Sequence, residues 1–311
     1  MRGSRTTRNF ISHAHGDHVA GFESKAENFS TIETKEVYTS RGMRTTNFKP
    51  LRCGERVVLS DLEITAHDAG HMLGSAQYEI QTPETSVLYT GDINCREALT
   101  TSKAEIVPCD ILIIEATYGL PFYVFPERDD VYREVVEWAL NQVQNGKTPV
   151  FQVYSAGKAQ EVIRLLNTFT KVPVVTNSAI TKVNDVYTRY GVSMDFIDLD
   201  AEEGKELIKK HECAYVIPTS QSYPIDEGFS RAFVTGWALK FKPRLNGNTA
   251  FPLSAHADFI QLVNYVEEAK PKKVYTVHGY KEEFADFIRR KLGINAEPIP
   301  PLQQTRLGEY L

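Results

Sequence analysis

The chain has 311 residues, of which 42% are hydrophobic and 24% charged, as in an ordinary folded protein with one or two domains. No run of about 18 apolar residues exists, so we expect no membrane span, and the N-terminus lacks a signal-peptide pattern, which makes cytoplasmic residence the default expectation. A net charge of −5 argues against a protein that coats nucleic acid through an overall basic surface, and 4 widely spaced Cys indicate buried thiols.

A heptapeptide near the start of the chain carries four potential metal donors: Ser12-His13-Ala14-His15-Gly16-Asp17-His18. Residues 8–11 indicate a short buried strand and residues 19–22 the first turns of a helix, so we expect the donors on a tight loop at a strand end. Imidazole suits zinc, and a carboxylate adds an oxygen donor that can reach a second ion. A solvated or accidental His cluster is the alternative, but so dense a set of donors favours a metal site.

Short strands with Gly, Pro and Asp turns are predicted over residues 56–91, after a helix and a mixed polar stretch over 19–50. Two further donors lie in turn-like phrases here, His71 in Ala69–Ser75 and Asp92 after the strand-like residues 86–89. Residues 110–115 form a continuous apolar strand that ends on Glu115, as a buried strand leading into a site would.

The middle of the chain alternates between strand and helix patterns. The expected elements are a helix at 129–145, a strand at 149–154, a helix at 157–169, a strand at 172–175, a helix at 179–190, and strands at 214–217 and 232–234. This alternation predicts a small α/β domain inserted into the first one. The acidic stretch 191–211 between them indicates a solvated face.

From about Phe251 we expect the chain to return to the first domain. The expected elements are a helix at 258–268, a strand at 273–277 and a final helix at 281–292. His256 precedes the first helix, and His278 follows the strand. The predicted domains are therefore residues 1–125 and 251–311 for the first domain and 126–250 for the insert.

Taken together, these motifs resemble the metallo-β-lactamase superfamily. The likeness lies in His-x-His-x-Asp-His at 13–18, Ala-Gly-His at 69–71 and Thr-Gly-Asp at 90–92. The phrases at 115–119, 254–258 and 277–279 resemble the extra motifs of its β-CASP nuclease branch. That branch includes the endonuclease of the cleavage and polyadenylation complex, ribonuclease J, and the exonucleases associated with bacterial DNA ligases. The phrases at 119–121, 157–160 and 230–237 are similar to the last group.

This resemblance implies an α/β fold, namely an αββα metallo-β-lactamase sandwich with an inserted small α/β β-CASP-like cap domain. The family carries at least one further strand pair, and an acidic residue, before the metal loop. Only 12 residues precede His13, so we expect these first strands to be lacking.

The resemblance also implies two zinc ions, for which manganese is a substitute. One zinc is expected at His13, His15 and His71, the other at Asp17, His18 and His278, with Asp92 bridging both. Oxygen-reducing di-iron members of the superfamily carry Glu at the place of His15, so His there favours zinc hydrolase chemistry. Two such ions can activate a water and neutralise charge that develops on a phosphate.

Asp17, Glu115 and His256 form the expected catalytic set. The resemblance implies that His256, left without a metal, protonates the leaving oxygen, while Glu115 orients it and raises its pKa. The physics agrees, because a neighbouring carboxylate favours imidazolium and makes His a usable general acid. A core His at 256 and a strand-end salt bridge at 115 are the structural alternatives.

The substrate is expected to be nucleic acid. The phrases around Glu115 and His256, with the inserted domain, favour phosphodiesters, and His278 resembles the RNA-acting members, whereas the ligase-associated likeness favours single-stranded DNA. Ser155, Gly157 and Lys158 at a helix start can contact phosphate, and Lys240 and Arg244 flank an aromatic in a basic stretch. Helix capping and a solvated loop are the alternatives for these two groups.

We therefore expect a metal-dependent endo- or exonuclease, most simply an RNA-processing enzyme of the mRNA 3′-end type. Two other functions stay open: a thioester or lactam hydrolase of the same superfamily, and a metal-free or inactive scaffold subunit of an RNA-processing complex. Single-stranded RNA ranks ahead of DNA as partner, no membrane is expected, and a homodimer is left open.

Overall fold

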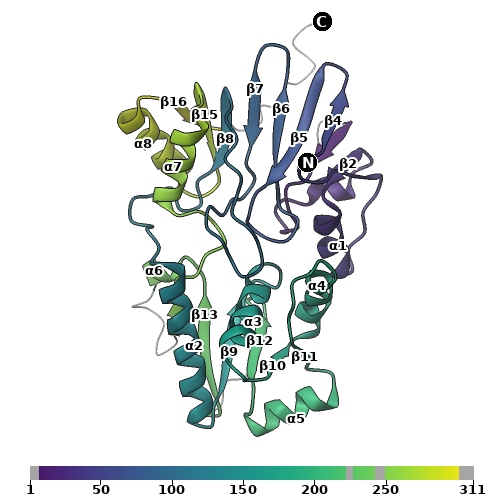
Figure 1. Cartoon of the computed structure of the whole chain (residues 1–311), viewed down its shortest axis with the longest axis vertical. Coiled ribbons are helices and arrows are strands. Elements are labelled where there is room, and N and C mark those ends of the chain that lie inside the picture. The colour runs from purple at the N-terminus through teal and green to yellow at the C-terminus, as the bar shows by residue number, and fades with distance from the viewer. Residues whose placement is uncertain (1–6, 222–226, 242–248, 301–311) are drawn as a thin grey trace, which may run out of the picture.

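A seven-stranded mixed sheet, in the order β16-β15-β8-β7-β6-β5-β4, forms the upper half of the molecule in Figure 1. The structure is a computed structural model and describes residues 7–221, 227–241 and 249–300. Its strands are β4 (Arg56–Leu59), β5 (Leu62–Asp68), β6 (Ala76–Gln81), β7 (Ser86–Tyr89), β8 (Ile111–Glu115), β15 (Lys273–Val277) and β16 (Asn295–Pro298). Strands β4 to β7 pair antiparallel, whereas β8, β15 and β16 add in parallel.

Two layers cover this sheet. The small parallel sheet of β1 (Arg8–Phe10), β2 (Glu27–Ser30) and β3 (Phe48–Pro50) packs over β5 and β6, with the rings of Phe10 and Tyr78 5.3 Å apart. The helices α7 (Phe259–Ala269) and α8 (Lys281–Phe287), followed by a π-helical turn (Ile288–Leu292), bury apolar residues of β7, β8 and β15. A 3-10 turn (Ala20–Glu23) and α1 (Ile32–Ser40) flank the small sheet.

The lower half in Figure 1 is a second α/β unit, whose six-stranded sheet is parallel throughout in the order β11-β10-β12-β9-β13-β14. The strands are β9 (Thr148–Val153), β10 (Val174–Thr176), β11 (Ile197–Asp198), β12 (Ala214–Pro218), β13 (Phe229–Val234) and β14 (Thr249–Phe251). The helices are α2 (Arg128–Gln144), α3 (Lys158–Phe169), α4 (Ser178–Arg189), α5 (Glu202–Lys210) and α6 (Ala238–Phe241).

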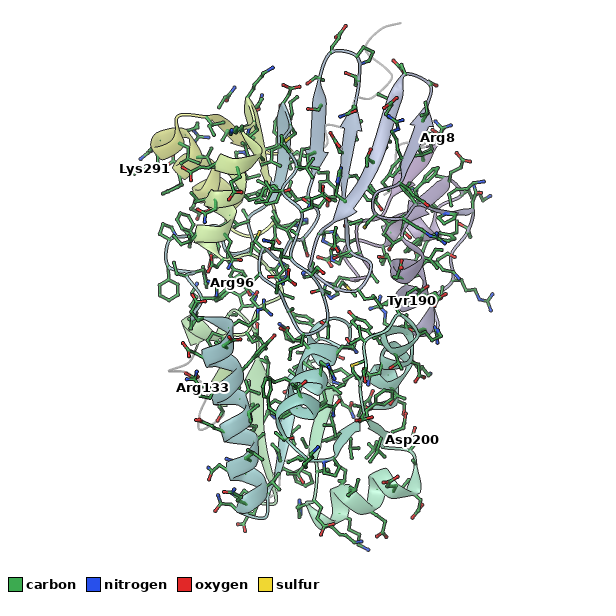
Figure 2. All side chains as sticks on the ribbon, viewed as in Figure 1. Arg8, Arg96, Arg133, Tyr190, Asp200 and Lys291 are labelled. Carbon is green, nitrogen blue, oxygen red and sulfur yellow. The ribbon has the colours of Figure 1, made fainter. Side chains whose placement is uncertain are left out.

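Each face of this sheet is buried by helices, as a parallel sheet requires. Apolar residues of α2, α3 and α4 form one core with β9, β12 and β13, while Leu207 and Ile208 of α5 pack on the opposite face against Val175 and Tyr215. Charged side chains lie on the outer surface, and Figure 2 shows Arg133 projecting from α2, where its side chain is 64% exposed.

The two halves pack against each other next to the loop that carries His13, His15 and His18. The core of the lower half continues into Met72 and Tyr38 of the upper half. The Leu73 N–H donates to the Tyr187 hydroxyl at 3.1 Å, and the Arg189 guanidinium lies 3.0 Å from Glu36. These contacts fix α4 against α1 and hold the lower half over the loops that leave the upper sheet.

The structure confirms the predicted α/β fold, and most predicted elements of the lower half lie within two residues of their expected bounds. Seven of the described elements were not predicted: β2, β3, β11, β14, β16, α5 and α6. The five strands are only two to four residues long, too short for an alternating pattern, α5 lies inside the acidic stretch 191–211, and α6 has only four residues. The expected helix after residue 19 is only a four-residue 3-10 turn.

The domain boundaries at 125/126 and 250/251 stay a prediction. No helix within the described ranges combines the length and apolar character that a membrane crossing needs.

Candidate active site

Four of the predicted site residues meet because their strands run in the same direction. β5, β7, β8 and β15 are mutually parallel, since β5 and β7 each pair antiparallel with β6, and β7, β8 and β15 pair in parallel. Their carboxyl ends therefore reach one edge of the sheet, where functional residues of α/β sheets collect. His71 and Asp92 follow β5 and β7 by three residues, Glu115 ends β8, and His278 directly follows β15.

The metal loop comes to the same edge from β1. Gly91 lets it approach: its φ is +56°, and a Cβ at this position would lie 2.7 Å from the Cβ of Ser12. Gly is the residue that adopts this conformation without steric cost. The Ser12 hydroxyl in turn lies 3.1 Å from Nδ1 of His13 and 3.4 Å from Nδ1 of His18.

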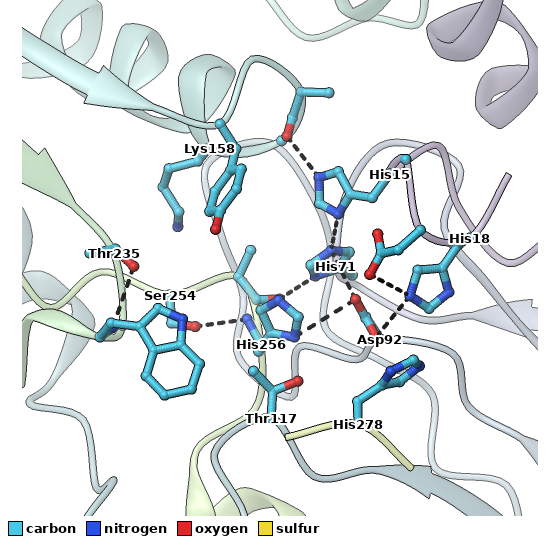
Figure 3. Close-up of a pocket in the computed structure, with 18 of the residues that line it drawn as sticks. His15, His18, His71, Asp92, Thr117, Lys158, Thr235, Ser254, His256 and His278 are labelled. Atoms are coloured by element: carbon cyan, nitrogen blue, oxygen red, sulfur yellow. Dashed lines mark hydrogen bonds and ion pairs between the residues drawn. The ribbon is translucent and has the colours of Figure 1, made fainter. Parts of the chain in front are cut away.

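Asp92 lies at the centre of the donor cluster (Figure 3). Its Oδ2 is 3.4 Å from Nε2 of His13 and 3.8 Å from Nε2 of His71, whereas its Oδ1 is 3.7 Å from Nε2 of His18. The donor atoms of His13, His15, His71 and Asp92 all lie within 4.8 Å of one another, and so do those of His18, Asp92 and His278. The two carboxylate oxygens thus face two separate groups of imidazoles.

Hydrogen bonds fix the tautomers of two of these rings. Nδ1 of His71 lies 2.8 Å from the Ala255 carbonyl, and Nε2 of His15 lies 3.2 Å from the Ala156 carbonyl. Because a carbonyl only accepts, each of these nitrogens carries the proton, and the other nitrogen of each ring keeps a lone pair. Those two lone pairs, on His71 Nε2 and His15 Nδ1, face each other at 3.1 Å, which a shared cation would stabilise.

The chemistry of the donor set also fits a divalent cation. Burial, followed by the neighbouring imidazoles, holds the pKa of His13 and of His71 well below the usual value, and burial lowers the pKa of His15 to about 4. The rings are therefore neutral ligands at physiological pH. Within the part of the chain that the structure describes, Nε2 of His13 is fully buried and makes no hydrogen bond. A buried ring nitrogen that makes no hydrogen bond is expected where a metal binds.

Asp92 responds to the same surroundings in the opposite way. Burial, and then the charge of Glu115, raise the pKa of the Asp92 carboxyl to about 7. A divalent cation next to it would favour the ionised form and lower this pKa.

Asp17 is the one predicted metal ligand that lies at the edge of the cluster. Its side chain is 74% exposed, and its Oδ2 lies 3.6 Å from Nε2 of His18. His278 approaches the same ring from β15, with the centroids of His18 and His278 5.1 Å apart. The role of Asp17 as ligand and catalytic residue stays a prediction.

Buried Glu115 and half-buried His256 form a pair beside Asp92. Nδ1 of His256 lies 3.0 and 3.1 Å from the Glu115 carboxylate oxygens, and the Ile93 N–H donates to Oε1 of Glu115 at 2.7 Å. Burial lowers the pKa of His256, but the charges of Glu115 and Asp92 outweigh it and raise this pKa to about 9. The pair therefore favours a protonated imidazole next to the metal-binding cluster.

A cavity of about 480 Å³ opens in front of this cluster, and both halves line it. The upper half contributes His15, His18, His71, Asp92, Tyr118, His256 and His278, and the lower half Tyr154, Ser155, Gly157, Lys158, Thr235 and Trp237. Its size suits a small ligand or part of a larger one.

The predicted substrate contacts separate into three groups. Ser155, Gly157 and Lys158 line the cavity, but the Lys158 ammonium pairs with Glu161 at 2.7 Å and the Gly157 N–H donates to the Gln160 side chain at 2.7 Å. Lys240 is exposed, and its Nζ lies 3.5 Å from the Tyr280 hydroxyl. Arg244 lies outside the described residues. All five stay predictions as substrate contacts.

Sequence reasoning missed Arg128 of α2, which connects the lower half to the loop after β7 and to the segment that carries His256. Its guanidinium pairs with Glu161 and donates to the Ser254 carbonyl at 3.0 Å and to Oδ1 of Asn94 at 3.3 Å. The Ser254 hydroxyl accepts from the His256 N–H at 2.9 Å. The partners of Arg128 are 33 to 126 residues away in the chain, so no local motif indicates them.

Two family models match parts of the chain. Residues 9–141 match a beta-lactamase superfamily domain, and residues 247–297 match a Zn-dependent metallo-hydrolase RNA specificity domain. The matched segments contain every predicted metal ligand and both residues of the pair Glu115 and His256.

Curated relatives and a solved structure are similar over most of the chain. A "Probable DNA ligase" of Opitutus terrae is 32% identical over 97% of this chain, which spans 29% of that protein. An "RNase J-like protein" of Methanocaldococcus jannaschii is 24% identical, and the alignment covers 75% of this chain and 67% of that protein. The cleavage and polyadenylation specificity factor subunit 3 of Dictyostelium discoideum is 25% identical, and the alignment covers 88% of this chain and 46% of that protein. A crystal structure of an Enterococcus faecalis protein of unknown function shares the fold, with a TM-score of 0.68, 14% identity, and 94% of this chain and 79% of that chain covered.

Proposed function

This chain belongs to the β-CASP branch of the metallo-β-lactamase superfamily. On that premise we propose that it is a metal-dependent nuclease, which cleaves phosphodiester bonds in single-stranded nucleic acid with two zinc ions. The observation that carries the proposal is the position of Asp92. One of its oxygens faces His13 and His71, the other faces His18, and the pair of Glu115 and His256 lies alongside.

Seven residues would hold the metals. His13, His15 and His71 would bind one zinc, Asp17, His18 and His278 the other, and Asp92 both. Bound there, zinc would supply positive charge for a phosphate and lower the pKa of a water.

The other residues act on the leaving side of the bond. His256 donates a proton to the leaving oxygen, because Glu115 holds its Nδ1 and leaves Nε2 for the substrate. Glu115 stays ionised: burial opposes its charge, but His256 and the Ile93 N–H outweigh burial, so the pKa of Glu115 lies below its usual value. Residues of both halves line the cavity, so a substrate bound there lies next to this acid.

RNA is the substrate we propose first. The match to an RNA specificity domain and the likeness to proteins named as an RNase and a polyadenylation factor support it, and so does His278, as in the RNA-acting members that its motif resembles. Single-stranded DNA is the second candidate, because the alignment with the protein named a DNA ligase extends over 97% of this chain. The chain spans only part of most of these relatives, so their partners and complete activities are not carried over. The homodimer stays a prediction.

Cleavage of matched oligonucleotides tests this proposal. End-labelled single-stranded RNA and DNA of one sequence are incubated with the protein as purified, with a chelator, and with zinc or manganese restored. We expect cleavage that the chelator abolishes and the added metal restores. The lengths of the labelled products distinguish an exonuclease, which shortens the strand stepwise, from an endonuclease, which cuts within it. His256→Ala should lower the rate by roughly 10²- to 10⁴-fold, the range for a general acid.

His211→Asn is the matched control. His211 caps α5 in the left-handed conformation, which Asn tolerates, and it is not among the residues that line the cavity. If neither nucleic acid is cleaved while a thioester or lactam is, the small-molecule hydrolase replaces the nuclease. Purified protein that binds no metal and cleaves nothing would support the scaffold subunit.

A further inference from the structure

Trp237 occupies a place in the cavity that metal chemistry and acid catalysis do not explain. It follows β13, lines the same cavity as His71, Asp92 and His256, and is half-buried. An indole at this place can be a packing residue or a surface for a ligand, and its surroundings distinguish the two.

Three tyrosine rings lie next to the indole. The ring centroids of Tyr118, Tyr123 and Tyr280 lie 4.9, 5.5 and 6.3 Å from that of Trp237. Tyr118 and Tyr123 are only 2% and 1% exposed, so they are the core of this aromatic cluster. Trp237 remains half-buried and reaches the cavity, which places it at the edge of the cluster that a ligand can meet.

The backbone at this position leaves the indole little freedom. A Cβ on Gly236 would lie 2.4 Å from the Tyr118 hydroxyl and 2.7 Å from the Phe125 ring, so the chain runs directly against the aromatic cluster. The Thr235 N–H donates to the Phe251 carbonyl at 3.0 Å, and the Trp237 N–H lies 3.4 Å from the Thr235 hydroxyl. An indole on this fixed backbone, with three rings beside it, loses little conformational entropy when it binds.

The cluster also connects the indole to the catalytic pair. The Tyr118 ring lies 4.9 Å from that of Trp237 and 6.0 Å from that of His256, so a single aromatic ring separates Trp237 from the proposed acid. On the other side, exposed Lys240 lies three residues after Trp237, with its Nζ 3.5 Å from the Tyr280 hydroxyl. An aromatic surface next to a cation is the usual arrangement for binding unpaired nucleotides.

We propose that Trp237 is a stacking platform for an unpaired nucleobase next to the bond that is cleaved. The inference rests on the proposed nuclease function and narrows it, since a stacked base must be free of its complementary strand. Every base has a π-face, so the platform accepts RNA and DNA alike and gives little sequence preference. Selection for single strands is then a property of this wall of the cavity.

Kinetics with three variants test the platform. Trp237→Ala should raise KM for a single-stranded oligonucleotide by roughly 5- to 150-fold, the range for losing one stacked base, and change kcat less. Trp237→Phe keeps an aromatic face and should recover most of the loss. Trp138→Phe is the control, because Trp138 packs against Phe151 and Phe251 outside the cavity.

Fluorescence gives a second readout that a packing role would not change. The chain has 2 Trp, so Trp138→Phe leaves Trp237 as the sole indole, and adding His256→Ala slows turnover during titration. We expect an intact oligonucleotide to quench the emission and one with an abasic nucleotide at the cleavage position to quench it far less. This measurement keeps the inference testable if Trp237→Ala does not fold.

The outcomes separate the inference from the function beneath it. If wild-type protein cleaves single strands while Trp237→Ala keeps its KM, or the abasic oligonucleotide quenches as well as the intact one, the platform is wrong and the nuclease stands. If wild-type protein neither binds nor cleaves any nucleic acid, the proposed function fails and the platform fails with it.

Discussion

Replacing buried Glu115 by Gln removes one charge from its pair with His256 and changes little else. The Glu115 carboxylate accepts from the Ile93 N–H at 2.7 Å and lies 3.0 Å from Nδ1 of His256. A Gln of the same shape can still accept from Ile93 through its amide oxygen, but it cannot stabilise an imidazolium. The change therefore tests the charge of Glu115 separately from its packing.

The size of the effect follows from the hydrogen bond that is lost. Burial lowers the pKa of His256, and the carboxylates of Glu115 and Asp92 raise it to about 9. A hydrogen bond to a charged group contributes about 1.5–3 kcal/mol, which corresponds to about 1 to 2 pH units. Because the pKa is raised, the acid is present at low pH and is lost as pH rises through it. In Glu115→Gln that loss occurs at lower pH, so the alkaline limb of kcat/KM moves down by about 1 to 2 pH units.

A cation at Asp92 would lower the pKa of His256 in the wild-type enzyme, but it would not change the direction of the shift that Glu115→Gln causes. It offsets the charge that Asp92 contributes to His256, so the alkaline limb of the metal-loaded enzyme should lie below pH 9. The contribution of Glu115 remains, and with it the expected displacement in the variant.

The assay compares two leaving groups over the neutral to alkaline range. With an oligonucleotide, whose leaving alkoxide needs a proton, Glu115→Gln should be slow and show the displaced limb. With a nitrophenyl phosphodiester, whose leaving phenolate needs none, the variant should approach the wild-type rate. Glu105→Gln is the control, since this 57% exposed side chain pairs with His67 outside the cavity. Wild-type rates and an unchanged pH profile in Glu115→Gln would refute the role of the pair, and equal losses on both substrates would indicate a structural role.

Two further changes test the metal-binding cluster and the contact between the halves. Zinc binding near pH 7 should release protons, because burial and the charge of Glu115 raise the pKa of Asp92 to about 7 and a bound cation favours the ionised carboxylate. Calorimetry in buffers of different ionisation enthalpy measures this release, and zinc binding without proton release would contradict it. In Arg128→Ala, Glu161 keeps only its ion pair with Lys158, and the Ser254 carbonyl loses a hydrogen-bond donor. The substitution should therefore lower the free energy of unfolding by about 2–4 kcal/mol, as measured by denaturant unfolding. Exposed Arg133→Ala should change it by less than about 0.5 kcal/mol, and equal effects of the two would argue against the contact.

The sequence predicted the donors better than it predicted what holds them. His13, His15 and His18 lie in one short loop, and His71, Asp92 and His278 follow strands, so the motifs and the family resemblance indicated residues that the structure brings together. Their role as metal ligands stays a prediction. The carbonyl groups that orient two of these rings belong to Ala255 and Ala156, which are 184 and 141 residues distant. Backbone contacts of this kind carry no side-chain signature.

Lys158 illustrates a different difficulty. Ser155, Gly157 and Lys158 at a helix start indicated a phosphate contact, and the helix begins at Lys158, within one residue of the predicted start. Its ammonium nevertheless pairs with Glu161 three residues later, a spacing that the sequence also contains. The choice between substrate and helix neighbour depends on burial: Lys158 is only 5% exposed, and burial can be read only from the packed structure.

Zinc-edge anomalous diffraction from crystals of the protein tests the central claim most directly. The account predicts two zinc peaks beside the Asp92 carboxylate, one next to His13, His15 and His71 and one next to His18 and His278, with both peaks weakened in Asp92→Asn. A single peak elsewhere, or two peaks that Asp92→Asn leaves unchanged, would contradict it.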